Sequence, residues 1–318
     1  MSPAVSIILP TFNRLEFLPH SIESVFAQTF TNWELLVADD GSGGDTRAYL
    51  QSLHDPPRVS ILWLPHSGKP AVARNAALRA AQGDYVAFLD SDDVWLPEKL
   101  QAQITSLLRH ADRGWSYTRF AVVDASGNPP VPARGGNWPA PTGWILEKLL
   151  LQHTVIALPS VIVSRRLLEK LGPFDEDLVM CEDDELWFRL AAHSEVDSVD
   201  EPLTLVRRHG QHFGSDVAAW RDRRRVFEKA LRAGGSAHLQ PVLRRLRAEM
   251  STGLARSQLN SADRLGALGT VLSSAPYSWR YPQWWRGALV GFAPAVLRRA
   301  VRRFRHTRSA KSAADMNP

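Results

Sequence analysis

The sequence predicts an α/β protein with a mainly parallel sheet flanked by helices, followed by a helical C-terminal extension. In residues 1–110, short β-rich apolar runs alternate with segments of helical spacing, the pattern of parallel strands joined by helices. From Trp220 onward the chain shows arginine-rich segments of helical spacing and no strand signal. With 318 residues, 44% of them hydrophobic, the chain is long enough for one large domain or two.

Four strands and four helices are expected in the first 110 residues. The strands are short, apolar and rich in β-branched residues, and they cover 5–9, 33–38, 59–64 and 85–89. The helices have apolar residues three or four apart or many alanines, and they cover 15–27, 45–53, 70–81 and 97–108. Pro97 suits the first turn of the last helix, because proline is tolerated there.

The following hundred residues show weaker patterns. Residues 124–143 are rich in Pro and Gly and predict a loop. A short helix is expected at 144–152, a strand at 160–163, and a helix at 186–192 after an acidic run.

Charge is divided unevenly along the chain. Residues 221–318 hold 20 Lys/Arg and 5 Asp/Glu, a net charge of +15, whereas residues 1–220 hold 18 basic and 28 acidic residues, a net charge of −10. Such asymmetry predicts a catalytic or binding body joined to a segment that meets an anionic surface.

Cysteine use and hydropathy favour a cytoplasmic protein. Cys181 is the single cysteine, which excludes an intrachain disulfide and a cysteine-based zinc cluster and fits a reducing compartment. We expect no signal peptide, because the apolar run 5–9 is short and lacks basic flanking residues. We also expect no membrane-spanning helix, since no uncharged stretch reaches about 20 residues.

Polar clusters directly follow three of the expected strands, at Thr11–Arg14, Asp39–Asp40 and Asp90–Asp93. Ligands bind at the carboxyl ends of parallel strands, so these clusters are expected to converge on one site. Asp90 and Asp92 are two residues apart, and an extended backbone would point both carboxylates to one side.

Crowded carboxylates are costly to keep charged, and a bound divalent cation removes that cost. All-oxygen ligands suit Mg²⁺ or Mn²⁺ held together with the phosphates of a substrate. Two other interpretations stay open: Asp90–Asp93 caps the next helix, and Asp39–Ser42 is only a turn.

The order and spacing of several segments resemble the inverting glycosyltransferases of family 2, which have the Rossmann-like GT-A fold. The resemblance covers roughly residues 4–210, and its segments are Val5–Arg14, Val37–Ser42, Gly68–Asn75, Phe88–Asp93, Gly172–Glu176, Glu182–Asp183 and Leu186–Trp187. We therefore expect a GT-A catalytic domain at 1–215, a basic helical extension at 216–305, and a disordered tail at 306–318, where the residues are polar and small.

The resemblance implies a nucleotide site at the first two loops. Pro10, Thr11 and Phe12 would border the base, and Asp40 would accept a hydrogen bond from its ring N–H, as a carboxylate can. Arg74 is also placed in the site, although an arginine on a helix is usually solvated.

Three weaker candidates for this site are Asn13, Asp39 and Lys69. Gly68-Lys69 is not a Walker motif, because the other glycine and the Ser or Thr after lysine are missing.

The resemblance implies separate roles for the DXD-like region, Phe88–Asp93, and for the later acidic run, Glu182–Glu185. Asp90 would lie near the ribose, Asp92 would bind the Mn²⁺ or Mg²⁺ that bridges the diphosphate, and Asp93 would support them. The cation would neutralise charge on the departing nucleoside diphosphate.

Asp183 matches the base that takes the proton from the acceptor hydroxyl, with Glu182 as its acidic neighbour and Asp184 as the alternative base. The other interpretation is a helix N-terminus favoured by acids. Trp187 is expected in the core or as a platform for the acceptor sugar. His209 is either a site residue or a surface histidine.

The implied activity is transfer of a sugar from a nucleoside-diphosphate sugar, with a UDP-sugar favoured, to a hydroxyl of a saccharide or lipid-linked acceptor. Two alternatives remain. A sugar-nucleotide nucleotidyltransferase would need a glycine-rich basic loop, which the segment after Leu9 lacks. The other is a non-catalytic, membrane-associated scaffold on the same fold.

Residues 277–305 combine aromatic residues, apolar runs and a series of arginines. This composition suits a helix that lies in an anionic membrane interface, and it also suits a helical lid with a solvated arginine face. Nucleic-acid binding is not expected, because the body is acidic and no recognised module is present.

Overall fold

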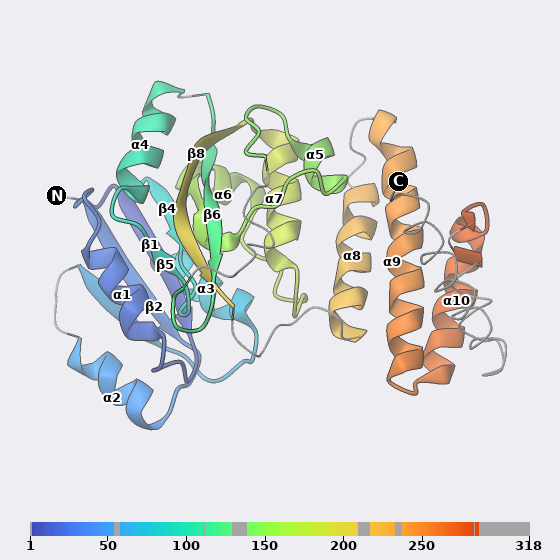
Figure 1. Ribbon diagram of the computed structural model, residues 1–318, viewed down its shortest axis with the longest axis horizontal. Coiled ribbons are helices and arrows are strands. Elements are labelled where there is room, and N and C mark those ends of the chain that lie inside the picture. Colours follow the sequence, from blue (N-terminus) through green and yellow to red (C-terminus); the bar gives the residue numbers. More distant parts are fainter. Residues whose placement is uncertain are drawn as a thin grey trace, which may run out of the picture. The chain divides into compact units, whose positions relative to one another are not determined.

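The computed structural model describes residues 2–53, 58–110, 112–128, 139–208, 217–232, 237–282 and 284–285. The chain divides into two compact units, residues 1–212 and 213–318. Figure 1 shows the α/β elements of the first unit and the helices of the second.

The described part of the N-terminal unit is built on an eight-stranded sheet in the order β3-β2-β1-β4-β7-β6-β8-β5. β3, β2, β1 and β4 run parallel to one another, as do β6 and β8, whereas β7 is antiparallel to β4 and β6, and β5 to β8. The predicted α/β fold with a mainly parallel sheet is confirmed. The strands are β1 (Val5–Thr11), β2 (Trp33–Asp39), β3 (Val59–Trp63), β4 (Tyr85–Phe88), β5 (Val94–Trp95), β6 (Trp115–Val123), β7 (Val161–Ser164) and β8 (Val196–Arg207).

Helices cover both faces of this sheet, because the side chains of a strand alternate between its two sides. In β1, Ile7 and Leu9 belong to one hydrophobic core and Ile8 to the other. The first core includes α1 (Leu18–Phe26), α2 (Gly44–Ser52) and α4 (Lys99–Arg109). The second includes α3 (Pro70–Ala80), α5 (Leu146–Leu150), α6 (Arg165–Leu171) and α7 (Glu182–His193).

β6 and β8, the longest strands described, were not predicted from the sequence. They pair in parallel from Trp115 and Val196 onward. The register shifts between Thr118 and Phe120. Opposite this irregularity β8 carries the exposed Asp200-Glu201-Pro202 segment, which breaks the alternation that predicts a strand.

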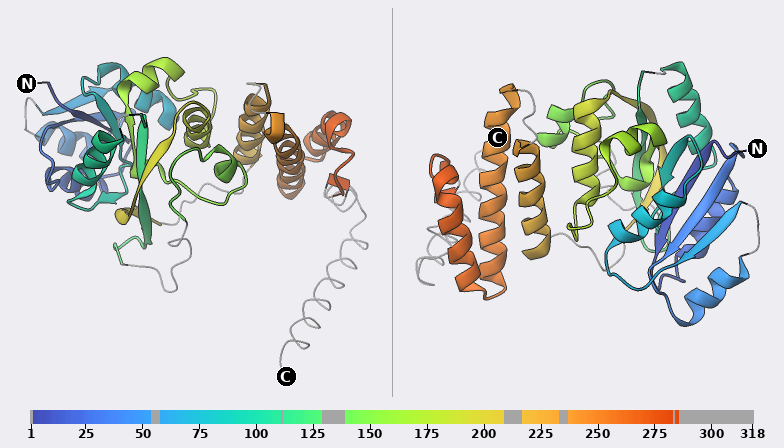
Figure 2. Two further views of the ribbon diagram at one scale, coloured as in Figure 1. Left: turned by 90° about the horizontal axis from the view of Figure 1, so that it is seen from above. Right: turned by 180° about the vertical axis from the view of Figure 1, so that it is seen from behind.

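The described part of the C-terminal unit is helical, with α8 (Val217–Arg232), the 3₁₀ helix η2 (Ala237–Leu239), α9 (Gln240–Asn260) and α10 (Arg264–Ser278). Figure 2 shows α8, α9 and α10 side by side. Trp220 of α8 lies against Gly253 of α9, where an added Cβ would be 2.3 Å from the indole ring. Within the described residues, no helix is both long enough and apolar enough to cross a bilayer.

Candidate active site

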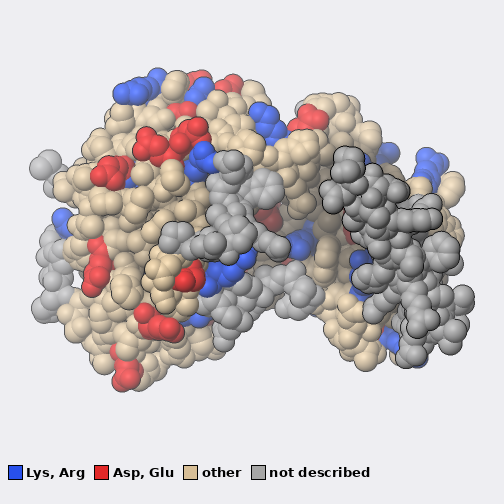
Figure 3. Space-filling view, viewed as in Figure 1, with Lys and Arg blue, Asp and Glu red and all other residues tan. Residues whose placement is uncertain are grey.

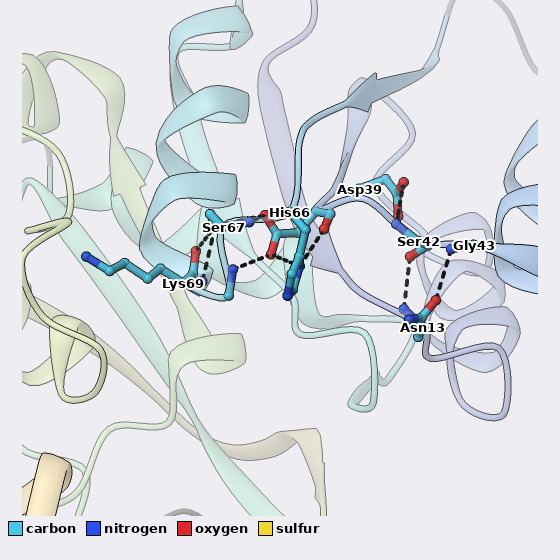
Figure 4. Close-up of polar contacts among 9 residues, drawn as sticks. Asn13, Asp39, Ser42, Gly43, His66, Ser67 and Lys69 are labelled. Carbon is cyan, nitrogen blue, oxygen red and sulfur yellow. Dashed lines mark hydrogen bonds and ion pairs between the residues drawn. The ribbon is translucent and has the colours of Figure 1, made fainter.

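The loops after β1 and β2 are joined to each other at the carboxyl end of the sheet. The backbone N–H of Asp40 donates to the carbonyl of Thr11 at 2.9 Å. Asn13 donates its backbone N–H to Ser42 Oγ at 2.9 Å and accepts from the Gly43 N–H through Oδ1 at 3.1 Å (Figure 4). Asn13 has a φ of 48°, a left-handed conformation that asparagine tolerates. The two loops thus form one rigid corner.

The neighbouring aspartates Asp39 and Asp40 make different contacts. Both oxygens of the buried Asp39 lie 3.1–3.2 Å from the Ser42 N–H, which makes Asp39 part of the turn. Asp40 Oδ1 accepts from the N–H and the hydroxyl of Ser67 at 2.9 and 2.8 Å. Asp40 Oδ2 accepts from the Gly68 N–H at 2.9 Å and lies 3.0 Å from His66 Nδ1. His66 Nδ1 also lies 2.9 Å from the backbone carbonyl oxygen of Asp40. A nucleobase N–H that approaches Asp40 Oδ2 would therefore compete with His66 for this oxygen.

His66, which was not among the residues assigned to the site from the sequence, lies at the predicted base site. Its ring stacks on Phe12, with centroids 3.9 Å apart and planes 19° apart. Phe12 is 39% exposed, a high value for a phenylalanine. Beside it, the Oγ1 atom of Thr11 is buried and has no hydrogen-bond partner within the described residues. No sequence signal distinguished His66 from any other loop histidine.

Arg74 lies at the junction of two acidic segments. Alanines at 71, 73, 76 and 77 let α3 pack closely on the sheet and bury this arginine. The guanidinium donates to Glu182 Oε1 at 2.6 Å and to Asp90 Oδ1 at 2.7 Å. Burial alone would lower the pKa of Arg74, but these two carboxylates raise it. The segment of the DXD-like turn is thereby joined to the start of α7.

Residues 90–93 form a turn, closed by a hydrogen bond of 3.1 Å from the Asp93 N–H to the Asp90 carbonyl. The expected extended backbone is therefore wrong, although the charge of Asp92 still acts on Asp90. The turn is fixed by Arg207 at the end of β8. Asp93 Oδ1 accepts from the Arg207 N–H at 2.7 Å, and Arg207 Nε donates to the Asp92 carbonyl at 2.9 Å. Arg207 was not identified from the sequence, because β8 was not predicted.

The carboxylates of this turn are costly to keep charged. Burial raises the pKa of Asp90 despite the opposing effect of Arg74, and the charge of Asp92 adds to the increase. The pKa of Asp93 is raised well above its usual value, first by burial and then by Asp92 and Asp90. Within the described residues, no group of three or more His, Cys, Asp or Glu is arranged to hold a metal ion. Asp90 and Asp92 fit Mg²⁺ or Mn²⁺ only in the mode where substrate oxygens complete the coordination.

The predicted base lies in the first turn of α7. Asp183 is half-buried between the buried Glu182 and the exposed Asp184, and it accepts the Asp184 N–H at 2.8 Å. The pKa of Asp183 is raised well above its usual value, first by burial and then by Asp184 and Glu182. A carboxyl group with a raised pKa suits proton removal near neutral pH.

The other predicted residues occupy different places. Trp187 is 1% exposed and stacks on Trp115 in the core, with ring centroids 5.9 Å apart, so it offers no platform to an acceptor. Lys69 Nζ donates to the Glu176 carbonyl at 2.8 Å. Pro10 is half-buried beside the first loop, and His209 lies outside the described residues.

The loop at 172–176 is held by residues that the sequence analysis did not assign to the site. Asn75 donates to the carbonyl of Phe174 at 2.9 Å and to Glu176 Oε1 at 2.8 Å, and it accepts the Phe174 N–H at 3.0 Å. Arg189 of α7 donates to the Gly172 carbonyl at 2.9 Å. Asn75, next to Arg74 on α3, therefore fixes this loop beside the acidic junction.

The fold and the placing of these acidic loops define the class of protein, an α/β transferase domain with the GT-A fold. The chain belongs to glycosyl transferase family 2, whose family model matches residues 6–171. It is 35% identical over 196 residues to the Escherichia coli UDP-Glc:alpha-D-GlcNAc-diphosphoundecaprenol beta-1,3-glucosyltransferase WfgD, a match that covers 62% of this chain and 73% of WfgD.

A second relative is the putative teichuronic acid biosynthesis glycosyltransferase TuaG of Bacillus subtilis, 37% identical over 128 residues, or 40% of this chain and 50% of TuaG. Among solved structures, S. aureus TarS 1-349 in complex with UDP-GlcNAc matches with a TM-score of 0.65 and 19% identity, covering 86% of this chain and 81% of that one. The mannosyltransferase PcManGT from Pyrobaculum calidifontis, in complex with GDP-Man and Mn²⁺, matches with a TM-score of 0.56 and 17% identity, covering 100% and 89%. These structural matches show a shared fold.

Proposed function

We propose that this protein is an inverting, metal-dependent glycosyltransferase that transfers a sugar from a UDP-sugar to a hydroxyl of a saccharide or lipid-linked acceptor. The observation that carries the proposal is the junction at Arg74, which joins the DXD-like turn to the N-terminus of α7 in a chain of family 2. A donor diphosphate and an acceptor hydroxyl must meet at such a junction for a single displacement to occur.

The donor base binds at the corner formed by the first two loops. Phe12 supplies an aromatic face, and Asp40 accepts a hydrogen bond from the ring N–H of the base. His66 is the partner of Asp40 that the base replaces, because its side chain is 49% exposed, whereas the Gly68 N–H is fixed in the backbone.

The sugar and diphosphate of the donor extend toward residues 90–93. Asp92 and Asp90 would hold a Mn²⁺ or Mg²⁺ ion, which would neutralise the charge on the departing nucleoside diphosphate. Arg74 keeps the Asp90 carboxylate in place, and Arg207 keeps the turn in its conformation through Asp93 and the Asp92 carbonyl.

Asp183 removes the proton from the acceptor hydroxyl as its oxygen attacks the anomeric carbon, on the face opposite the leaving diphosphate. The proton ends on the Asp183 carboxylate, and the bond to the diphosphate oxygen breaks as the new glycosidic bond forms, which inverts the anomeric configuration. The raised pKa of Asp183 supports this role.

The proposed setting is the assembly of a cell-surface polysaccharide or glycolipid at the cytoplasmic face of a membrane. It is supported by the name of the E. coli relative, which transfers glucose to a diphosphoundecaprenol-linked sugar, and by the teichuronic acid pathway named for the B. subtilis relative. The single Cys181 fits a reducing compartment.

A thermal-shift panel tests the proposal, with UDP, UDP-glucose, UDP-GlcNAc and GDP-mannose, each with and without Mn²⁺. We expect a UDP compound to raise the melting temperature more in the presence of Mn²⁺ than in its absence, because a ligand that binds only the folded state stabilises it. No shift with any nucleotide, with or without Mn²⁺, would contradict the proposal and favour a non-catalytic scaffold. The family match counts against the nucleotidyltransferase alternative.

A further inference from the structure

Helix α10 buries small polar residues and exposes large apolar ones. The side chains on its packed face are Ala267, Thr270, Ser274 and Ser278, none of them more than 7% exposed. On the opposite face, Leu265 is 84% exposed, Leu268 42%, Leu272 63%, and Trp279 at the helix end 53%. A helix that contacts only water on its outer side shows the reverse arrangement.

The packed face is held by specific polar contacts, so the orientation of α10 in its unit is well defined. Thr270 Oγ1 donates to Gln258 Oε1 of α9 at 2.7 Å. Trp284 Nε1 donates to Ser274 Oγ at 2.9 Å, and Trp284 is itself buried. A rotation that buried the leucines would break both hydrogen bonds and place the serines and the threonine in water.

The exposed leucines and Trp279 recur three, four and seven residues apart, which places them on one continuous stripe. Aromatic and basic residues adjoin the C-terminal end of this stripe. Trp285 Nε1 donates to the Trp279 carbonyl at 2.7 Å, and the Arg280 guanidinium lies 5.1 Å from the centroid of the Trp279 ring. Tryptophan and arginine together favour the boundary between lipid and water.

The charge of the surrounding sequence indicates what covers the stripe. From Arg264 to the end of the chain there are ten Lys or Arg residues and a single acid, Asp315. In the view of Figure 3, most of the acidic side chains lie on the N-terminal unit. Two copies of so basic a segment would repel each other, whereas an anionic surface attracts it.

We propose that the apolar stripe of α10, formed by Leu265, Leu268, Leu272 and Trp279, docks on an anionic lipid bilayer. The leucines enter the boundary between headgroups and acyl chains, and the basic residues contact lipid phosphates. Membrane contact was one of two interpretations of residues 277–305 in the sequence; the stripe begins upstream of that segment, at Leu265, and shares Trp279 with it. The inference is independent of the proposed transfer, because vesicle binding is measured without any sugar nucleotide.

The first test is sedimentation of the full chain with vesicles of phosphatidylcholine alone or with phosphatidylglycerol. We expect binding to the anionic vesicles, and loss of about tenfold in the partition coefficient for L268Q/L272Q, since each leucine contributes buried apolar area. Leu108→Gln is the matched control, because Leu108 is 70% exposed on α4 of the other unit, and it should bind as the native chain does. Native binding that is undetectable, or equal binding by L268Q/L272Q, would overturn the proposal.

The second test does not require the double variant to fold. An environment-sensitive fluorophore is attached at Leu272→Cys in a Cys181→Ser background, and its emission should shift to the blue only when anionic vesicles are added. A probe that is already buried without vesicles would overturn the proposal, because the stripe would then be covered by this chain or by a second copy. Light scattering on the same sample distinguishes these two cases.

Discussion

Arg74 and Glu182, 108 residues apart in the sequence, form a buried ion pair with an N–O distance of 2.6 Å. The second terminal nitrogen of the same guanidinium holds Asp90 at 2.7 Å. The planar guanidinium presents its donors in a fixed geometry that a lysine lacks. The candidate metal turn and the candidate base are therefore held at a fixed separation by one side chain.

Replacing Arg74 with methionine should leave the buried Glu182 and the partly exposed Asp90 without their arginine partner. We expect Arg74→Met to reduce the free energy of unfolding by about 3 kcal/mol and kcat/KM by about 100-fold, because an ion pair is broken and the site loses its alignment. Denaturant unfolding and steady-state kinetics measure the two effects. Arg79→Met, an exposed position on the same helix, is the control and should change neither. Equal stability of both variants would contradict the role assigned to Arg74.

Asp183→Asn should separate donor binding from transfer. The amide keeps the size of the side chain but cannot take a proton, so we expect unchanged binding of UDP with Mn²⁺ and a loss of transfer of about 10²- to 10⁴-fold. Asp184→Asn, a change at the exposed neighbouring position, should reduce the rate of transfer far less. If Asp184→Asn were the more damaging change, the base would be Asp184, and unimpaired transfer in both variants would exclude this acidic run from proton removal.

The raised pKa of Asp183 predicts a pH dependence of transfer. The base works only when ionised, so kcat/KM should fall as the pH drops through this raised pKa, well above the value of about 4 that is typical of aspartate. Asp184→Asn removes a neighbouring negative charge that raises this pKa, so its acid limb should move to lower pH. Donor affinity measured over the same range is the control. Superimposable profiles for both proteins would contradict this electrostatic assignment.

Lys99 predicts a pH dependence of stability that is unrelated to catalysis. It is fully buried, with Nζ 2.7 Å from Gln103 Oε1 and 4.1 Å from the centroid of the Trp95 ring. Burial lowers the pKa of Lys99 well below 10.5, so between the folded pKa and 10.5 the unfolded chain binds a proton that the folded chain does not. The contribution of Lys99 to the free energy of unfolding therefore rises with pH across that window.

Urea unfolding of the native chain and of Lys99→Met at a series of pH values measures this effect. The variant should show a weaker increase of stability as the pH rises toward 10.5, because it has no proton to bind at this position. Parallel stability curves for the two proteins would show that Lys99 titrates normally in the fold.

The elements whose sequence patterns are local could be predicted from the sequence. The four parallel strands at the N-terminus and the helices between them follow from apolar runs and helical spacing, and their carboxyl ends carry the predicted polar loops. β8 was missed because Asp200-Glu201-Pro202 interrupts its alternation, and Arg207, which fixes the turn at Asp93, was missed with it. The stacking of His66 on Phe12 depends on loops that the fold brings together, and no residue spacing in the sequence predicts it.

The most direct test of the central claim is donor hydrolysis and transfer by the native chain and by Asp92→Asn, each measured with UDP-sugars at several Mn²⁺ concentrations. If Asp90 and Asp92 hold one cation on the donor diphosphate, the native chain should require Mn²⁺ or Mg²⁺, and the variant should lose about 100-fold or more in rate while keeping its melting temperature. Equal rates in the two proteins, or a native rate that is unchanged by EDTA, would contradict the account.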